Sequence, residues 1–274
     1  MSVKLTILVD DFACKPNLIT EHGLAILVAG PTLSVLFDAG RTAEALMHNA
    51  DELGKDLSAI SAVVVSHGHR GHAGAVLDLA RQREGLHVHA HRRAFNRRWA
   101  QRPGQALENV SSPCNLERLQ DAGCVFHPVN APEMLAEWLI LSGQIGGTRQ
   151  GQRSFVTLWG DEMVPDTFAD ELCLFVRGRR GWVVVTGCCH RGLKNTLRAA
   201  KFLVRGEPIT ALFGGVHLSD WTNRDFDQVA HILGDFGNPS LYLCHCGQGQ
   251  GLDLLQKRLP GLVHAVSAGT EIEF

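Results

Sequence analysis

Three histidines, His67, His69 and His72, lie within six residues directly after the apolar run at residues 62–65. A turn that leaves a strand can aim His67 and His69 at one ion, while His72 opens the next helix and faces a neighbouring position. Neutral imidazole is the commonest metal ligand in proteins. The alternative is a set of loop histidines that cap the helix. The spacing favours a metal site.

Three further apolar runs also end in histidine or cysteine: VVVTG before Cys188 and His190, ALFGG before His217, and LYL before Cys244 and His245. Sites in layered α/β proteins collect beyond strand ends, and imidazole and thiolate both suit zinc and iron. We therefore expect Cys188, His190 and His245 to be metal ligands. For Cys188 and His190 the alternative is a buried cysteine pair with a capping histidine. His217 is expected either to bind metal or to donate a hydrogen bond to substrate.

Other side chains are weaker candidates. His87, His89 and His91 alternate along one run, which is compatible with a metal site but also with any half-exposed strand. Asp38 ends a strand and could orient a metal ligand through a hydrogen bond. Asp170 and Glu171 are expected simply to start a strand.

The segment at residues 91–102 is rich in arginine and resembles a helix. Its arginines are Arg92, Arg93, Arg97, Arg98 and Arg102. Guanidinium groups bind phosphate and other anions well, so this segment could bind an anionic substrate. A solvated helix face is the favoured interpretation.

The composition limits the classes of partner that the chain is expected to bind. The chain has 274 residues with a formal net charge of -2, so it has no general attraction for nucleic acid or anionic membranes. No apolar run approaches the roughly 20 residues that span a bilayer, and the N-terminus resembles neither a signal peptide nor an anchor. These features predict a cytoplasmic protein with thiols rather than disulfides and a small-molecule substrate. They leave the oligomeric state open.

Strand-like and helix-like segments alternate along the whole chain. Strands are expected at residues 5–10, 24–30, 33–40, 59–66, 86–91, 137–147, 173–178, 182–187, 208–215, 240–245, 262–267 and 270–274, with helices at 41–54, 71–85, 191–204, 225–237 and 252–259. The pattern predicts one layered α/β domain over residues 1–274. Residues 146–170 are expected to be an irregular loop that faces the substrate.

The histidine motif resembles the H-x-H-x-D-H signature of the metallo-β-lactamase superfamily. Within it, the chain is similar to the branch named for 7,8-dihydropterin-6-yl-methyl-4-(β-D-ribofuranosyl)aminobenzene 5'-phosphate synthase. The blocks that carry the resemblance are EHGLAILV, LFDAGRTAEALMHNADELG, VVVSHGHRGHAGA, VPDTFADELCLFV, VVVTGCCHRGLKNT, FGGVHL and CHCG. The resemblance implies an αβ/βα sandwich with a metal site at one edge between two sheets.

The resemblance also implies a ligand set of one or two ions, with zinc expected and iron or manganese as options. His67, His69 and His190 would hold the first ion. His72 and His245, with Cys188, would hold the second.

Two positions depart from the pattern of the family: Gly71 stands where the signature has aspartate, and Gln144 lies where the branch carries a glutamate. We expect the second ion to bind more weakly for this reason. On the sequence alone, Gly71→Asp is expected to raise its occupancy.

The resulting prediction is a metal-dependent hydrolase acting on a small anionic metabolite, one that carries a phosphate for example. Because the signature aspartate would normally serve as general base, His72 or His217 is expected to take that role, with weak or altered hydrolysis. Two alternatives stay open. One is a non-catalytic thiol sensor or ligand-binding pseudoenzyme, and the other is condensation of a pterin with an aminobenzene ribotide phosphate.

Overall fold

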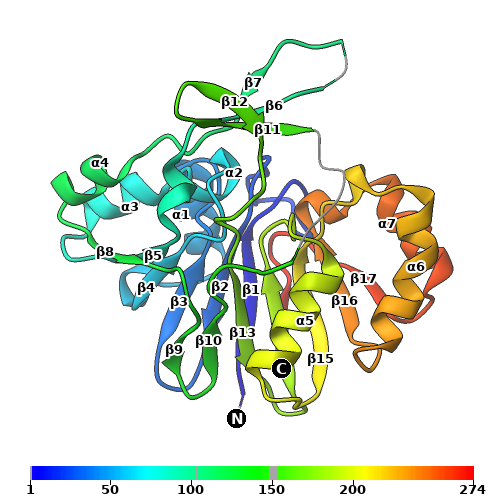
Figure 1. Cartoon of the computed structure of the whole chain (residues 1–274). Helices are drawn as coiled ribbons and strands as arrows, with labels where there is room; N and C mark the ends of the chain where they lie inside the picture. The colour runs from blue at the N-terminus through cyan, green and yellow to red at the C-terminus, as the bar shows by residue number, and fades with distance from the viewer. Residues whose placement is uncertain (1, 103, 148–153) are drawn as a thin grey trace.

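Two seven-stranded sheets lie face to face in the computed structural model, which describes residues 2–102, 104–147 and 154–274 (Figure 1). The first sheet runs in the order β18 (Glu271–Glu273), β1 (Lys4–Val9), β2 (Ala25–Ala29), β3 (Ser34–Phe37), β4 (Ala62–Val64), β5 (His87–Ala90) and β8 (Val125–Pro128). The second runs in the order β17 (Val263–Ala265), β16 (Ser240–Cys244), β15 (Ile209–Gly215), β14 (Trp182–Thr186), β13 (Cys173–Arg177), β10 (Leu139–Leu141) and β9 (Glu133–Ala136).

Each sheet contains a parallel half. Strands β3, β4, β5 and β8 pair in parallel in the first sheet, as do β14, β15, β16 and β17 in the second. The remaining pairs of both sheets are antiparallel. Because parallel strands end at the same edge of a sheet, the loops that follow β14, β15 and β16 gather at one place.

The main core fills the space between the two sheets. Leu5 and Ile7 of β1 point into it, as do Val183 and Val185 of β14, and none of these four side chains is exposed to solvent. The two-residue spacing follows from the alternation of side chains along a strand. Trp138 closes the core against Gly30, where even a Cβ would overlap the indole ring.

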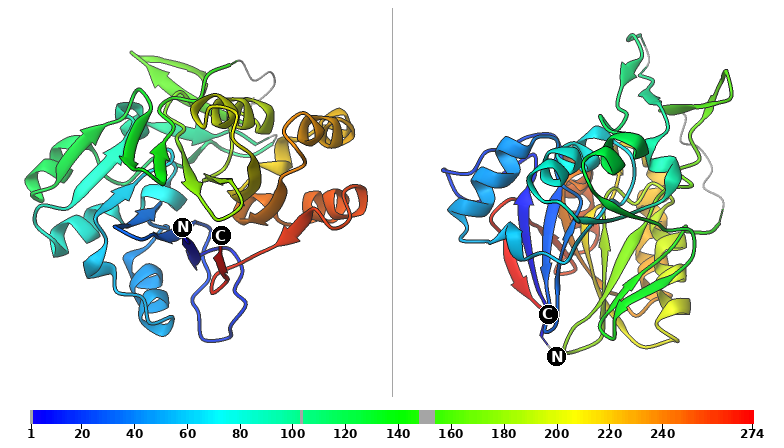
Figure 2. Two further views of the ribbon diagram at one scale, coloured as in Figure 1. Left: turned by 90° about the horizontal axis from the view of Figure 1, so that it is seen from below. Right: turned by 90° about the vertical axis from the view of Figure 1, so that its left-hand side faces the viewer.

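Helices cover the outer face of each sheet (Figure 2). The helices are α1 (Ala43–Glu52), α3 (Val76–Gln82) and α4 (Leu116–Asp121) on the first sheet, and α5 (Leu193–Leu203), α6 (Asn223–Gly234) and α7 (Gln250–Arg258) on the second. Shorter turns are α2 (Arg70–Ala73) and the 3₁₀ segments η1 (Leu57–Ala59), η2 (Arg92–Phe95), η3 (Leu218–Asp220) and η4 (His245–Gly247). This arrangement confirms the predicted αβ/βα sandwich. None of the described helices combines the length and the apolar character that crossing a bilayer requires.

A small third sheet projects above the sandwich (Figure 1). Its strands are β12 (Glu162–Pro165), β11 (Phe155–Trp159), β6 (Arg98–Ala100) and β7 (Glu108–Asn109). The prediction of an irregular loop over residues 146–170 is therefore wrong for 155–165, which form an antiparallel hairpin. FVTLW and EMVP lack the regular alternation that marks a half-buried strand in sequence, so their conformation depends on pairing, of β11 with β6 and of β12 with β11. Residues 148–153 of that prediction lie outside the described residues.

The helix predicted at residues 91–102 is also wrong. η2 is a single 3₁₀ turn, and Arg98 lies on β6 with only 1% of its surface exposed. Its guanidinium pairs with Asp170 at 3.0 Å and with Asp166 at 3.5 Å. An arginine becomes buried when carboxylates compensate its charge, which a linear run of arginines cannot reveal.

The inter-sheet core gives a direct test of the fold. Phe213 of β15 is fully buried between the sheets, so Phe213→Ala is expected to lower the free energy of unfolding by about 3–5 kcal/mol. Phe202, with 81% of its surface exposed on α5, is the matched control, and Phe202→Ala should stay within about 0.5 kcal/mol of the parent. Urea denaturation measures both, and equal losses would contradict this packing.

Candidate metal centre

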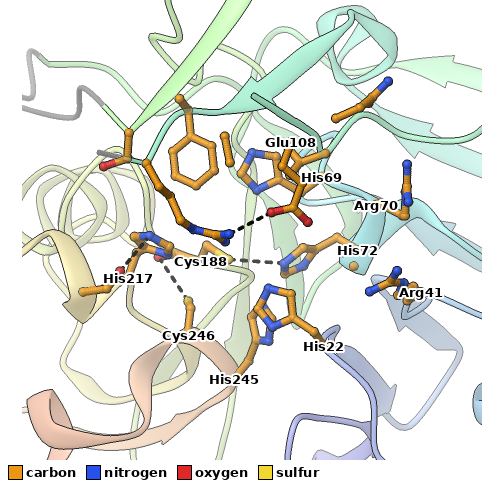
Figure 3. Close-up of a pocket in the computed structure, with 18 of the residues that line it drawn as sticks. His22, Arg41, His69, Arg70, His72, Glu108, Cys188, His217, His245 and Cys246 are labelled. Atoms are coloured by element: carbon orange, nitrogen blue, oxygen red, sulfur yellow. Dashed lines mark hydrogen bonds and ion pairs between the residues drawn. The ribbon is translucent and has the colours of Figure 1, made fainter. Parts of the chain in front are cut away.

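The four histidine-bearing strand ends meet at one edge of the sandwich. His67 and His69 follow β4 of the first sheet, while Cys188 and His190 follow β14 of the second. His217 follows β15, and His245 with Cys246 follows β16. Every metal-binding residue expected from sequence therefore reaches the same region, from both sheets. Figure 3 shows His69, His72, Cys188 and His245 among them.

His67, His69 and His190 form the most enclosed group. Their potential ligand atoms all lie within 4.8 Å of one another. The Nε2 atoms of His67 and His69 are buried and have no hydrogen-bond partner within the described part of the chain. A buried polar atom without a partner is costly, and a metal ion would satisfy both nitrogens. The geometry thus fits the ligand set expected for the first ion.

Burial keeps the imidazoles of His67 and His69 neutral. Loss of hydration holds the pKa of His67 well below its usual range, and the neighbouring rings of His72 and His69 add to the effect. The pKa of His69 is likewise well below its usual range, first because of burial and then because of Arg98. Neutral imidazole is the form that binds metal, so these shifts favour coordination.

The backbone around His67 and His69 is held tightly. Gly68 donates its N–H to the Asp170 carboxylate at 2.9 Å, and its carbonyl accepts from Ser112. A Cβ on Gly68 would lie 1.7 Å from the carbonyl oxygen of Ala94, so only glycine fits between the two histidines. Asp170 thus links the histidine loop to the buried Arg98.

His72 begins a second group. Its Nδ1 lies 2.7 Å from Asp38, which also accepts hydrogen bonds from the N–H and the hydroxyl of Ser66. Its Nε2 lies 3.2 Å from the sulfur of Cys188. Because a carboxylate only accepts, Nδ1 carries the proton and Nε2 faces the site. Asp38 therefore has the orienting position expected from sequence.

The sulfurs of Cys188 and Cys246 lie beside His245. The ligand atoms of these three residues fall within 4.8 Å of one another, and Cys188 also groups with His190 and His217. Burial raises the pKa of Cys188 well above its usual range. For Cys246, burial acts in the same direction, but hydrogen bonds with Cys188 and His217 outweigh it and hold the pKa well below the ordinary value. This pair can supply a thiolate.

Several residues of the site were not predicted from the sequence. Glu171 does not merely start a strand, because its carboxylate accepts the backbone N–H groups of His190 and Arg191, both at 2.5 Å. His22 and Asp11 reach the site from the N-terminal region and group with His245. The only signal for them was their polarity beside apolar strands.

The trio of His87, His89 and His91 does not join the centre. His87 and His89 instead stack on His127 of the neighbouring strand β8, with ring centroids 5.0 and 4.3 Å away. His91 accepts a hydrogen bond from the backbone of Arg93. Within the described residues, none of the three belongs to a group that could hold a metal.

Several residues at the site adopt a left-handed backbone conformation. Asp38, Phe168, Cys189 and His245 all have φ between 49° and 59°, although none is glycine. Such conformations cost of order 1–3 kcal/mol each and persist where the surroundings enforce them. In this chain they turn the segments that follow β3, β14 and β16 sharply into the centre.

The centre opens into a pocket of about 520 Å³. His69, His72, His217 and His245 line it on one side. The third sheet and its flanks line the other, with Ala100, Gln101, Arg102, Glu108, Asn109, Val110 and Phe155. Arg41 and Arg70 also line it, so positive groups and metal-binding groups share one cavity (Figure 3).

Comparison with known proteins points to one family. Residues 19–140 match the family model described as the metallo-beta-lactamase superfamily. The 7,8-dihydropterin-6-methyl-4-(beta-D-ribofuranosyl)-aminobenzene-5'-phosphate synthase of Methanocaldococcus jannaschii is 21% identical over 100% of this chain and 97% of its own length.

Two solved structures are similar over nearly the whole chain. Tm1679, described as a metal-dependent hydrolase of the beta-lactamase superfamily, has a TM-score of 0.84 and 25% identity, with 99% of both chains covered. The metallo-beta-lactamase fold protein YhfI from Bacillus subtilis has a TM-score of 0.60 and 14% identity, with 100% of this chain and 99% of that chain covered. The second likeness concerns the fold alone.

Removal of His67, one of the three histidines of the most enclosed group, tests the metal centre. His67→Ala deletes one of three converging imidazoles, so it is expected to lower the metal content of the protein by about one ion per chain. Metal content measured by mass spectrometry checks this. His231, exposed on α6, is the matched control, and His231→Ala should bind as much metal as the parent. Equal metal in both variants would contradict the assignment.

Gly71→Asp is a second test, and the structure reverses the expectation from sequence. A Cβ at position 71 would lie 2.8 Å from the carbonyl oxygen of His22 and 3.1 Å from Cα of Gly23. We therefore expect both Gly71→Asp and the matched Gly71→Ala to lose about 1–3 kcal/mol of stability, without a gain in metal. Thermal unfolding and metal content measure this. Higher metal occupancy at unchanged stability would contradict this expectation. It would show that the backbone at residues 22–23 moves to accommodate the aspartate without loss of stability.

Proposed function

We propose that this chain is a metal-dependent hydrolase of the metallo-β-lactamase superfamily that acts on a small anionic metabolite, with a phosphorylated metabolite as the preferred class. The observation that carries the proposal is the shared pocket, which joins the histidine centre to Arg41 and Arg70. A purely structural metal site would be closed, whereas a catalytic one keeps access to substrate.

The residues present fit a zinc site. His67, His69 and His190 form one group and would hold a first ion. His72 and His245 with Cys188 would hold a second, since Cys188 groups with His72 in one cluster and with His245 in another. Nitrogen and sulfur ligands suit zinc or iron better than manganese. When bound, such an ion lowers the pKa of its water to about 7 and polarises the bond to be broken.

Arg41 and Arg70 provide the argument for an anionic substrate. Both line the pocket, and neither guanidinium makes a hydrogen bond or ion pair within the described ranges. Guanidinium groups match phosphate and carboxylate oxygens in a two-point geometry. Phe155 lies in the same pocket and offers an apolar face for the rest of the substrate.

His217 is the better candidate for proton transfer. It lines the pocket, and its Nε2 lies 3.0 Å from the Ser219 hydroxyl, which fixes the ring. His72 is 1% exposed and held between Asp38 and Cys188, so it fits a ligand role better than a mobile proton carrier. A well-placed base contributes roughly 10²–10⁴-fold to the rate.

The similar proteins support parts of the proposal. The description of Tm1679 as a metal-dependent hydrolase supports the reaction class. The name of the archaeal synthase describes a product that carries a phosphate, which supports the substrate class. Its identity of 21% does not favour the same synthase reaction in this chain.

A substrate panel tests the proposed function. Zinc-loaded protein is assayed with phosphomonoesters, phosphodiesters, organic diphosphates and lactones, beside His67→Ala and the control His231→Ala. The proposal expects hydrolysis of at least one anionic class, lost in His67→Ala and kept in His231→Ala. Activity that survives His67→Ala would overturn it, as would a preference for neutral lactones.

Arg41→Ala tests the recognition of charge. Loss of a charge-assisted hydrogen bond costs about 1.5–3 kcal/mol, so KM for the active anionic substrate should rise about tenfold or more, with kcat within about twofold. Steady-state kinetics measures both constants. Arg198→Ala removes an exposed arginine on α5, outside the pocket, and should leave KM unchanged. An unchanged KM in Arg41→Ala would exclude Arg41 from substrate binding.

A further inference from the structure

His22 lies beside the second group of ligands although it is 50 residues away from His72 in sequence. It belongs to the connection between β1 and β2, and 68% of its side chain is exposed. It also lines the same pocket as His72 and His245. Figure 3 shows the three rings gathered at the lower end of the pocket, with His22 directly beside His245.

One carboxylate holds two of these rings. Asp11 Oδ2 lies 2.7 Å from Nδ1 of His22, and Asp11 Oδ1 lies 2.5 Å from Nδ1 of His245. Because the carboxylate accepts, both Nδ1 atoms carry protons, which leaves Nε2 as the nitrogen through which either ring would bind a metal. A carboxylate that orients an imidazole through the nitrogen not bound to metal is a common arrangement around metal ions.

The three rings follow one another closely. The centroid of His245 is 4.8 Å from that of His22 and 5.0 Å from that of His72. Asp38 holds Nδ1 of His72 in the same way that Asp11 holds the other two. Three imidazoles from three separate segments are thus each anchored at Nδ1 by a carboxylate.

Gly71 explains how His22 can approach. Leu24 donates its N–H to the Gly71 carbonyl at 2.9 Å. A Cβ on Gly71 would meet the His22 carbonyl oxygen at 2.8 Å, and a Cβ on Gly23 would meet the Gly71 carbonyl oxygen at 2.6 Å. The two backbones therefore pack directly together only because both positions are glycine. The residue that removes the carboxylate from the signature also makes room for the histidine.

We infer that His22 is a ligand of a second metal ion, in place of the carboxylate absent at Gly71. It would bind together with His245, with which it already groups, and with His72, whose ring lies next to that of His245. Asp11 is a positioning residue that orients His22 and His245. The inference rests on the proposed function for the existence of a metal centre. Exchange of a carboxylate for a neutral imidazole removes one negative charge, which favours zinc, cobalt or nickel over manganese or magnesium.

Metal titration tests the inference without any assay of activity. Metal-free protein is titrated with Zn²⁺ against a chromophoric chelator, and the bound ions are counted by mass spectrometry. The parent should bind two ions. His22→Ala should keep the first and weaken the second by at least about 10–100-fold, since loss of even an orienting partner of a ligand costs that much. Asp11→Asn should weaken the second ion in the same direction.

Controls separate the possible failures. His231→Ala should bind both ions as the parent does, and His22→Asn repeats the test with a polar side chain should His22→Ala unfold. If the parent binds no metal, the proposed function itself fails. If the parent binds metal and His22→Ala and His22→Asn leave every affinity unchanged, only the role of His22 is overturned. The role of His22 is also overturned if the parent binds a single ion, and His67→Ala loses that ion whereas His22→Ala keeps it.

Discussion

The buried carboxylate of Asp38 is the interaction on which the centre depends. It lies at the end of β3, is inaccessible to solvent, and accepts hydrogen bonds from the Ser66 N–H, the Ser66 hydroxyl and His72. A buried charge is tolerated only when such bonds replace its hydration. Gly187 of the second sheet packs on the same group, since a Cβ there would lie 2.1 Å from the Ser66 hydroxyl and 3.0 Å from Asp38. One carboxylate thereby anchors the start of the histidine loop at a point where the two sheets are in close contact.

Much of this arrangement could be predicted from sequence because it follows from local patterns. Apolar runs of strand length that end in histidine or cysteine indicate both the strand and the place where its polar end emerges. His67, His190 and His245 come together because parallel strands end at one edge and two sheets face each other there. The sandwich itself was predictable from the alternation of strands and helices together with the family resemblance.

The parts of the fold and of the site that could not be predicted from sequence depend on contacts between distant segments. His22 and Asp11 carry no spacing motif, and only the close packing of Gly23 on Gly71 brings them to the site. Arg98 resembles one member of a solvated arginine run, yet it is buried against two aspartates, Asp166 and Asp170, that lie 68 and 72 residues further along the chain. The hairpin of β11 and β12 was missed for the same reason, since its pairing with β6 joins segments that are far apart in the chain.

The pocket draws its two walls from different parts of the fold. The metal-binding side chains stand on loops of the rigid sandwich, whereas Gln101, Arg102 and Phe155 belong to the small third sheet or its flanks. The two walls are nevertheless joined directly, because Asp170 accepts the Gly68 N–H of the histidine loop and also pairs with Arg98 of β6. Side chains of the third sheet that face the pocket can change what the protein accommodates, whereas a change that displaces β6 would also disturb the histidine loop. The strand that shapes the substrate wall is therefore also one of the supports of the reactive centre.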